Sequence, residues 1–215
     1  DEKAPFAWGP GERRALGPGP GEIWVEQDGS AGTPITRLVG EPRALTHLFD
    51  DVTAVAFAVR RPRTVAVIGA GGGRDVLTAL AAGAEHVTAI ELHPELVALV
   101  RGPYGEYSGH LYDRSDVTVL TGDGRQALAR RADRFDLVQL SLIDSWAATA
   151  AGAYTLAENH LYTLEAFRLY WSRLTPTGLL STSRWMRGGF GLELPRLVLL
   201  VKAALVAEGV ADPEA

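Results

Sequence analysis

Apolar segments and amphipathic segments alternate along the chain from Thr64 onward. The apolar segments consist almost wholly of Val, Ile, Leu and Ala, which is typical of parallel strands buried on both faces. Each is followed by apolar residues at helical spacing. The expected strands are 64–70, 86–92, 116–122, 135–141 and 178–185, and the expected helices are 74–82, 95–101, 124–132, 163–174 and 194–209. The pattern predicts an α/β fold with a doubly wound, mostly parallel Rossmann-like sheet.

The N-terminal part has a different pattern. Residues 1–21 are rich in Pro and Gly and predict an irregular lead-in. Two alternating segments around "DGSAG" predict a small β-hairpin over about 22–39, and a helix is expected from Pro42 to the residues before Arg61. We therefore divide the chain into a lead-in over 1–21, a hairpin plus helix over 22–60, and a Rossmann-like domain over 61–215.

Composition narrows the range of functions. The chain has 215 residues, 47% of them hydrophobic, which suffices for one sizeable core. It has no cysteine, and its five histidines lack a paired spacing, so we expect no metal site. A net charge of −5 without a basic cluster argues against a nucleic-acid partner. No segment is apolar for long enough to insert into a membrane.

The ends of the first three strands carry candidate ligand-binding residues. Glycines 69, 71 and 73 lie between a strand and a helix, where they allow a sharp turn and the close approach of a ligand. Glu91 ends the second strand, at the offset of roughly twenty residues where a carboxylate accepts ribose hydroxyls. Asp123, followed by Gly124, ends the third strand, where its carboxylate would accept a hydrogen bond from adenine. Together these residues predict an adenosine site.

Each of these acids also has a structural interpretation. Glu91 would be a surface charge, and Asp123 would be the N-cap of the helix that begins at Gly124. Arg74 occupies the position of the third glycine of dinucleotide enzymes, which argues against a dehydrogenase.

A long connection follows the fourth strand, from Ile143 to His160. Connections of this length at the carboxyl edge of a sheet are typical of lids or acceptor pockets. The candidate catalytic acid is Asp144, with Glu158 and His160 as second choices. The candidate substrate-binding residues are Trp146, Tyr154, Tyr162, Arg184 and Trp185. In the alternative interpretation, Asp144 and His160 cap or pack against helices, Arg184 forms an ion pair and Trp185 belongs to the core.

These motifs resemble the spermidine synthase-like branch of the class I S-adenosylmethionine-binding enzymes, which includes the polyamine aminopropyltransferases. The resemblance runs from about 22 to 211. It depends on the hairpin, "VIGAGGGRDVL", "IELHPELV", "TGDGRQAL", "FDLVQLSLIDSWAATAAGAYTLAENHLYTLEAFR" and "GLLSTSRW". It implies a seven-stranded sheet and a nucleotide cofactor whose sulfonium donates an alkyl group.

The chain departs from that family at two positions. Aminopropyltransferases carry a Gly-Gly-Gly-Asp-Gly-Gly loop whose aspartate holds the amine of the donor, and the aligned residue is Gly72. Their fourth strand ends in Asp-Ser-Ser-Asp-Pro. Here Ser141 replaces the first aspartate, which helps to deprotonate the acceptor, and Asp144 keeps the second. Ser141, which we include in the cofactor site, cannot act as a base at neutral pH unless a partner activates it.

The glycine turn also bears on which cofactor binds. Arg74 would pair with the α-carboxylate of intact S-adenosylmethionine and Asp75 with its α-amine. Alternatively, Arg74 is a solvated residue at the helix start, and Asp75 is a first-turn acid that interacts favourably with the helix dipole. The expected function is transfer of a methyl or related alkyl group from S-adenosylmethionine to a small acceptor. The alternatives are aminopropyl transfer from decarboxylated S-adenosylmethionine and a non-catalytic adenosine-nucleotide-binding module.

The C-terminal end leads to two further expectations. The resemblance implies a closing antiparallel hairpin after the last helix, and the sequence ends before it, so we expect these strands to be missing. An open strand edge invites pairing, and we expect a homodimer or another association to cover it. The expected location is cytoplasmic. Because some similar bacterial proteins carry membrane helices ahead of this domain, the alternative is the soluble domain of a membrane-anchored protein.

Overall fold

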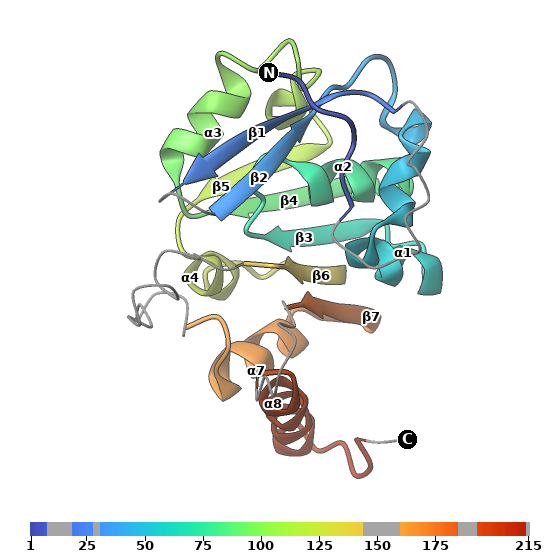
Figure 1. The fold of residues 1–215 in the computed structure, drawn as a ribbon. Coiled ribbons are helices and arrows are strands. Elements are labelled where there is room, and N and C mark those ends of the chain that lie inside the picture. The colour runs from blue at the N-terminus through green and yellow to red at the C-terminus, as the bar shows by residue number, and fades with distance from the viewer. Residues whose placement is uncertain (8–18, 28–30, 144–159, 185–192, 214–215) are drawn as a thin grey trace.

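The structure is a computed structural model that describes all residues except 8–18, 28–30, 144–159, 185–192 and 214–215. Its centre is a five-stranded parallel sheet with the order β5-β4-β3-β6-β7 (Figure 1). The strands are β3 (Thr64–Ile68), β4 (His86–Glu91), β5 (Val117–Thr121), β6 (Phe135–Ser141) and β7 (Leu174–Ser183). The predicted α/β fold with a doubly wound parallel sheet is therefore confirmed.

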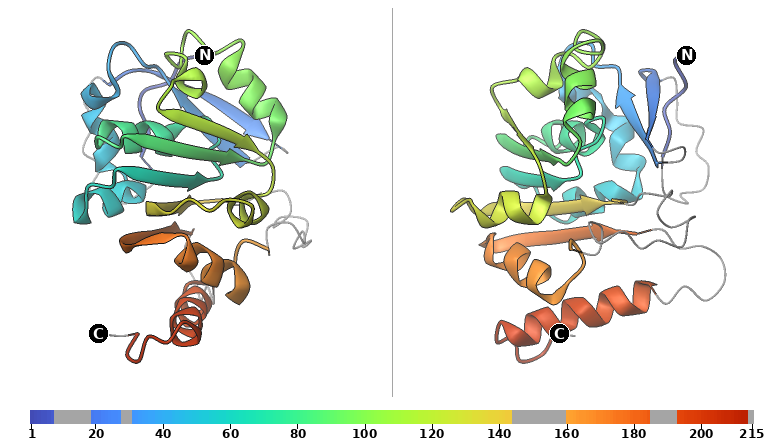
Figure 2. Two further views of the ribbon diagram at one scale, coloured as in Figure 1. Left: turned by 180° about the vertical axis from the view of Figure 1, so that it is seen from behind. Right: turned by 90° about the vertical axis from the view of Figure 1, so that its left-hand side faces the viewer.

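Helices cover both faces of this sheet because successive side chains of each strand point to opposite sides. Val65 and Val67 of β3 belong to the core under α2 and α3, whereas Ala66 and Ile68 belong to the core under α4, α7 and α8. The helices are α2 (Arg74–Ala81), α3 (Pro94–Arg101), α4 (Gly124–Ala129), α7 (Leu164–Ser172) and α8 (Glu193–Ala207). Figure 2 shows α8 packed against α7, beyond β7.

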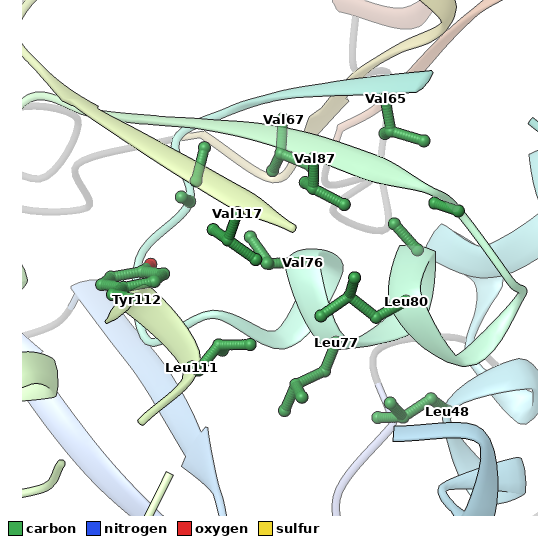
Figure 3. Packing of buried hydrophobic residues seen from close by; sticks show 14 of the residues in the cluster. Leu48, Val65, Val67, Val76, Leu77, Leu80, Val87, Leu111, Tyr112 and Val117 are labelled. Carbon is green, nitrogen blue, oxygen red and sulfur yellow. The ribbon is translucent and has the colours of Figure 1, made fainter. Parts of the chain in front are cut away.

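The core between the sheet and α2 consists mainly of apolar side chains. Val76 and Leu77 of α2 are completely buried, and Val76 lies between α2 and the sheet, near Val87 of β4 and Val117 of β5 (Figure 3). Burying each such side chain stabilises the fold by about 1.5–3 kcal/mol. This packing fixes the start of α2 against the end of β3, so the glycine turn between them has a defined position.

The predicted N-terminal hairpin is confirmed. It consists of β1 (Glu22–Gln27) and β2 (Ala31–Thr36), which pair antiparallel. β2 also contacts α2, so the hairpin lies next to the glycine turn.

The prediction of one helix from Pro42 onward is wrong. The segment consists of three 3₁₀ turns, η1 (Pro42–Ala44), η2 (Thr46–Asp50) and η3 (Val52–Ala54), followed by the short α1 (Val55–Val59). Asp51 interrupts the helical backbone with φ −87° and ψ 141°. Its carboxylate accepts a hydrogen bond from the Thr53 N–H and pairs with Arg74. Asp51 therefore ends one 3₁₀ turn and caps the next, at a position that a continuous helix would cross.

The strand order changes direction at β3, which lies between β4 and β6. In doubly wound sheets, ligands bind at such a switch point, beyond the carboxyl ends of the strands. Gly69, Glu91 and Ser141 follow or end β3, β4 and β6, so the candidate residues gather at this edge. β7 pairs only with β6 in the part of the chain that the structure describes, and the expected association at its edge stays a prediction. No helix among the described residues has the length and apolar character needed to span a membrane.

Candidate active site

The glycine turn at the end of β3 has the backbone conformation that its sequence predicts. Gly69, Gly71 and Gly73 have φ values of 73°, 56° and 94°, which residues with a Cβ rarely adopt. The amides of the turn are hydrogen-bonded within the chain. Gly71 N–H donates to Glu91, Gly72 N–H donates to the Thr33 hydroxyl, and Gly73 N–H donates to the Ala70 carbonyl. These three N–H groups are therefore not available to a ligand, which could contact the turn only through its backbone surface.

The hairpin packs directly against this turn. A Cβ on Gly72 would overlap the Pro34 carbonyl of β2, and a Cβ on Gly71 would lie 2.5 Å from the Thr33 hydroxyl. The Tyr112 hydroxyl donates a 2.7 Å hydrogen bond to the Gly71 carbonyl, and the Tyr112 side chain is buried (Figure 3). Sequence analysis missed Thr33 and Tyr112 because neither is near the turn in the chain.

Glu91 occupies the position that sequence analysis assigned to it. Its residue is 5% exposed, so the interpretation as a solvated surface charge is wrong. Gly71 N–H donates to Oε2 at 2.8 Å and His93 N–H donates to Oε1 at 3.0 Å. A carboxylate oxygen has two lone pairs, so each oxygen keeps one for another donor. These two acceptor positions match a pair of neighbouring hydroxyl groups.

Leu92 directly follows Glu91, and 49% of its surface is exposed. At the end of β5, a Cβ on Gly122 would meet no atom within 4 Å. An exposed apolar side chain beside open space suits the flat face of a purine. Sequence analysis missed Leu92, although its signal is an apolar residue that continues past the end of the strand.

Asp123 is the N-cap of α4, because its Oδ1 accepts a 2.8 Å hydrogen bond from Gln126 N–H. The structural interpretation is therefore confirmed, and a contact with adenine stays a prediction. Gly124 is buried, and a Cβ there would overlap Ile68 of β3. Gly124 thus brings the start of α4 close to the sheet.

The environment of Arg74 agrees neither with a solvated helix start nor with a residue free to pair with a cofactor. Its side chain is only 6% exposed, so the prediction of a solvated residue at the helix start is wrong. Its guanidinium pairs with Glu22 and Asp51, each at 3.2 Å, and donates to the Phe6 carbonyl. These partners all belong to the N-terminal segment, which disfavours the predicted pairing with a cofactor carboxylate.

Asp75 lies in the first turn of α2 and is only 8% exposed. Burial raises the pKa of its carboxyl, and hydrogen bonds with Ser141 and Gln139 oppose that rise in pKa. Gln139 of β6 is fully buried, and its amide donates to the Ser141 hydroxyl at 3.1 Å. Gln139 is a further residue that sequence analysis missed. Its signal is the amide within the otherwise apolar strand "FDLVQLS".

We predict that Asp75→Asn changes the pH dependence of stability. Because burial raises the pKa of Asp75, the folded state binds its proton more tightly than the unfolded chain does. The carboxyl therefore contributes stability below its ordinary pKa, and this contribution is lost as pH rises through the raised value. Relative to the wild type, Asp75→Asn should gain unfolding free energy as pH rises above the ordinary aspartate pKa of 3.8.

Asp136 provides a control of opposite sign. Hydrogen bonds from the Arg63 and Thr64 backbone and from Thr175 outweigh burial and lower its pKa. Asp136→Asn should therefore lose stability relative to the wild type as pH rises toward the ordinary aspartate pKa of 3.8, and the difference should stay constant above it. Urea unfolding at several pH values measures both variants. A difference for Asp75→Asn that stayed constant or fell with pH would contradict the assignment.

The acceptor side of the site combines β6, β7 and the segment before α7. The Arg184 guanidinium lies over the Tyr162 ring, 4.4 Å from its centroid, and Nη1 donates to the Ile143 carbonyl at 3.4 Å. The Ile143 side chain would lie 2.8 Å from a Cβ on Gly69. The structure therefore brings Tyr162 and Arg184 together next to the glycine turn.

The remaining acceptor candidates fall into two groups. His160 is exposed, and Thr163 caps α7 by accepting a hydrogen bond from Ala166 N–H, so the prediction that His160 caps this helix is wrong. The others lie outside the described residues, namely Asp144, Trp146, Tyr154, Glu158 and Trp185.

Comparisons with known proteins agree with this fold. No family model matches the chain. It is 30% identical over 132 residues to polyamine aminopropyltransferase 2 of Hyperthermus butylicus, a match that covers 61% of this chain and 41% of the relative. Among solved structures, spermidine synthase from Thermotoga maritima superimposes with a TM-score of 0.51 at 14% identity, covering 95% of this chain and 62% of that one.

A spermidine synthase in complex with the transition-state analogue AdoDATO gives a TM-score of 0.50 at 16% identity, covering 80% of this chain and 54% of that one. The chain thus matches less than two thirds of the length of each of these proteins. The predicted resemblance to the spermidine synthase-like proteins is confirmed, in sequence by the curated relative and in fold by the two solved structures.

Proposed function

We propose that this chain binds S-adenosylmethionine and belongs to a transferase that moves a methyl or related alkyl group to a small acceptor. The observation that carries the proposal is the buried Glu91 carboxylate, which two backbone N–H groups hold beside the glycine turn. The confirmed resemblance supports it, since the curated relative is named as a transferase and one solved structure is titled as a complex with AdoDATO.

The residues at the sheet edge fit a sulfonium nucleoside. Each Glu91 oxygen keeps an acceptor position for a ribose hydroxyl, and Leu92 and Gly122 leave an apolar, open surface for the base. When bound, the cofactor supplies an electrophilic carbon attached to a positively charged sulfur. The chain's own part is then to orient the acceptor and to exclude water. Ile143, Tyr162 and Arg184 line the acceptor side beside Gly69.

Aminopropyl transfer is the second candidate, because the curated relative is a polyamine aminopropyltransferase. Two observations favour methyl or related alkyl transfer over aminopropyl transfer. The aspartate that holds the donor amine in aminopropyltransferases aligns with Gly72, and β2 fills the space of a side chain there. Ser141 replaces the first aspartate at the end of β6. Both positions lack the carboxylates on which that reaction depends.

We predict that Gly72→Ala destabilises the chain by roughly 2–4 kcal/mol, because its Cβ would overlap the Pro34 backbone carbonyl. The matched control is Gly209→Ala. Gly209 has φ 85° with no atom within 4 Å of a Cβ, so this substitution adds backbone strain alone, about 1 kcal/mol. Thermal unfolding measures both variants. If Gly72→Ala were as stable as the wild type, β2 would not cover the turn as described.

Calorimetric titration tests the proposed function and discriminates the donors. We expect S-adenosylmethionine and methylthioadenosine to bind, and decarboxylated S-adenosylmethionine to bind no more tightly than S-adenosylmethionine. Preferential binding of the decarboxylated donor would favour aminopropyl transfer. Absence of binding by all three would refute the proposal.

A second experiment tests whether the chain is catalytic. Incubation with labelled S-adenosylmethionine and a panel of primary amines separates a transferase, which forms a labelled product, from a non-catalytic binding module.

A further inference from the structure

The side chain of Ile143 covers Gly69 from the end of β6. Its Cγ1, Cδ1 and Cγ2 atoms lie 2.8, 3.1 and 3.3 Å from the position of a Cβ on Gly69. Glycines 71–73 of the same turn are covered instead by β2 and by Leu111. Ile143 is partly exposed, so it forms an apolar surface where the turn meets the edge of the sheet. A ligand that reaches Gly69 would therefore contact Ile143.

An unusual backbone conformation puts Ile143 in this place. Along β6, Leu137 belongs to the core under α2 and α3, whereas Val138 and Leu140 belong to the core under α4, α7 and α8. Continued alternation would place residue 143 on the same face as Leu137, yet Ile143 packs against the core that contains Leu140. Leu142 has φ 52°, a left-handed conformation that large apolar residues rarely adopt. This residue therefore switches Ile143 to the other face, and strain of this kind clusters at functional sites.

Contacts from the end of β7 hold this conformation. Leu142 N–H donates to the Ser183 carbonyl at 3.0 Å. Nη1 of Arg184 donates to the Ile143 carbonyl at 3.4 Å, and the Arg184 guanidinium lies over the Tyr162 ring. Both residues that follow β6 are thus bound to β7, so Ile143 has a defined position in the chain without a ligand.

The proposed nucleoside would bring its 5′ substituent to Ile143. The ends of β5, β4, β3 and β6 lie side by side in that order, with neighbouring strands about 4.8 Å apart. The base is proposed to lie near Gly122 after β5, and the ribose hydroxyls are proposed to bond to Glu91 at the end of β4. Because the 5′ substituent leaves the ribose ring opposite the base, it points toward β3 and β6. Gly69 and Ile143 follow these two strands.

We propose that Ile143 is a specificity-determining residue that selects nucleosides with a methylated sulfur at the 5′ position over those with a 5′ hydroxyl, an inference that rests on the proposed function. The S-methyl group would lie against the Ile143 side chain. A hydroxyl in the same place would lose its hydration without gaining a hydrogen bond. Leu142 is a positioning residue in this account, because its backbone conformation sets the place of Ile143.

Calorimetric titration with methylthioadenosine and with adenosine tests this inference without a turnover assay. The two nucleosides share the base and the ribose hydroxyls and differ at the 5′ position. The readout is the ratio of their dissociation constants, since a change in folding affects the binding of both. We expect the wild type to bind methylthioadenosine roughly tenfold more tightly than adenosine.

Ile143→Val and Ile143→Thr form a matched pair, because Val and Thr have the same shape and differ in one methyl group against one hydroxyl. Ile143→Val should keep a preference of about fivefold or more for methylthioadenosine. Ile143→Thr should keep about twofold or less, because its hydroxyl can bond to the 5′ hydroxyl of adenosine. Leu200→Ala is the control. Leu200 of α8 is partly buried against the same core as Ile143, so its truncation should lower stability and leave the ratio unchanged.

Two substitutions at position 142 test the positioning role. Glycine adopts a positive φ without strain, so Leu142→Gly should keep the wild-type ratio within about twofold. Valine is β-branched and disfavours this conformation more than leucine does, so Leu142→Val should lower the ratio to about that of Ile143→Thr. Equal ratios in Leu142→Gly and Leu142→Val would overturn the role of Leu142.

The two proposals fail in different ways. If neither nucleoside binds the wild type, the proposed function is overturned, and this inference with it. If both bind the wild type equally, or if Ile143→Val and Ile143→Thr give the same ratio, only the role of Ile143 is overturned. A loss of affinity in Ile143→Thr that is equal for the two nucleosides would show a merely structural role and have the same consequence.

Discussion

Replacing Glu91 by glutamine is expected to weaken binding of S-adenosylmethionine and methylthioadenosine roughly 100-fold. The carboxylate offers one acceptor position on each oxygen, whereas an amide offers acceptor positions on one oxygen only. The variant loses a charge-assisted hydrogen bond to one hydroxyl and weakens the other. Each such bond contributes about 1.5–3 kcal/mol. Calorimetry with both nucleosides measures the effect.

Glu95→Gln is the matched control for this prediction. Glu95 is an exposed acid in the first turn of α3, four residues farther along the chain, and its substitution removes the same charge. It should leave nucleoside binding unchanged within about threefold. A Glu91→Gln variant that folded normally and still bound both nucleosides like the wild type would show that Glu91 does not hold the ribose.

Replacing Arg74 by methionine is expected to lower the free energy of unfolding by roughly 3–5 kcal/mol. The variant leaves Glu22 and Asp51 buried without their shared positive partner. Burial already raises the pKa of Glu22, and Arg74 is the main group that opposes this rise. Without Arg74, the Glu22 carboxyl should bind its proton still more tightly, so the loss of stability should increase from acidic to neutral pH.

The control for Arg74 is Arg63→Met. Arg63 pairs with Glu85 at 2.7 Å, but both side chains are largely exposed to solvent, so its removal should cost much less stability than the removal of Arg74. Adding Glu22→Gln to Arg74→Met should recover part of the lost stability. Urea unfolding at two pH values measures all three variants. A cost for Arg74→Met as small as that for Arg63→Met would contradict the buried ion-pair network.

The sheet was predictable because burial on both faces leaves a strong pattern in the sequence. Strands such as Thr64–Ile68 and His86–Glu91 consist mostly of Val, Ile and Ala and are bounded by turns. The segment after Pro42 was not predictable, although its apolar residues follow helical spacing. The helical pattern is interrupted at Asp51, whose carboxylate caps η3 and also pairs with Arg74, a residue distant in the chain.

Part of the candidate site was predictable on the same grounds as the sheet. Glu91 and the glycine turn follow from topology, because the carboxyl ends of parallel strands meet at one edge. The environments of Arg74 and Asp75 could not be predicted. Both residues begin α2, where a sequence pattern predicts a solvated helix start, and the N-terminal segment and β6 bury them. Only contacts between distant segments reveal that Arg74 pairs with Glu22 and Asp51.

A crystal structure of the chain with methylthioadenosine is the most direct measurement of the central claim. We predict that the two ribose hydroxyls donate to the two oxygens of Glu91, and that the base lies against Leu92 near Gly122. A nucleoside bound elsewhere, or a ribose with no contact to Glu91, would contradict the account.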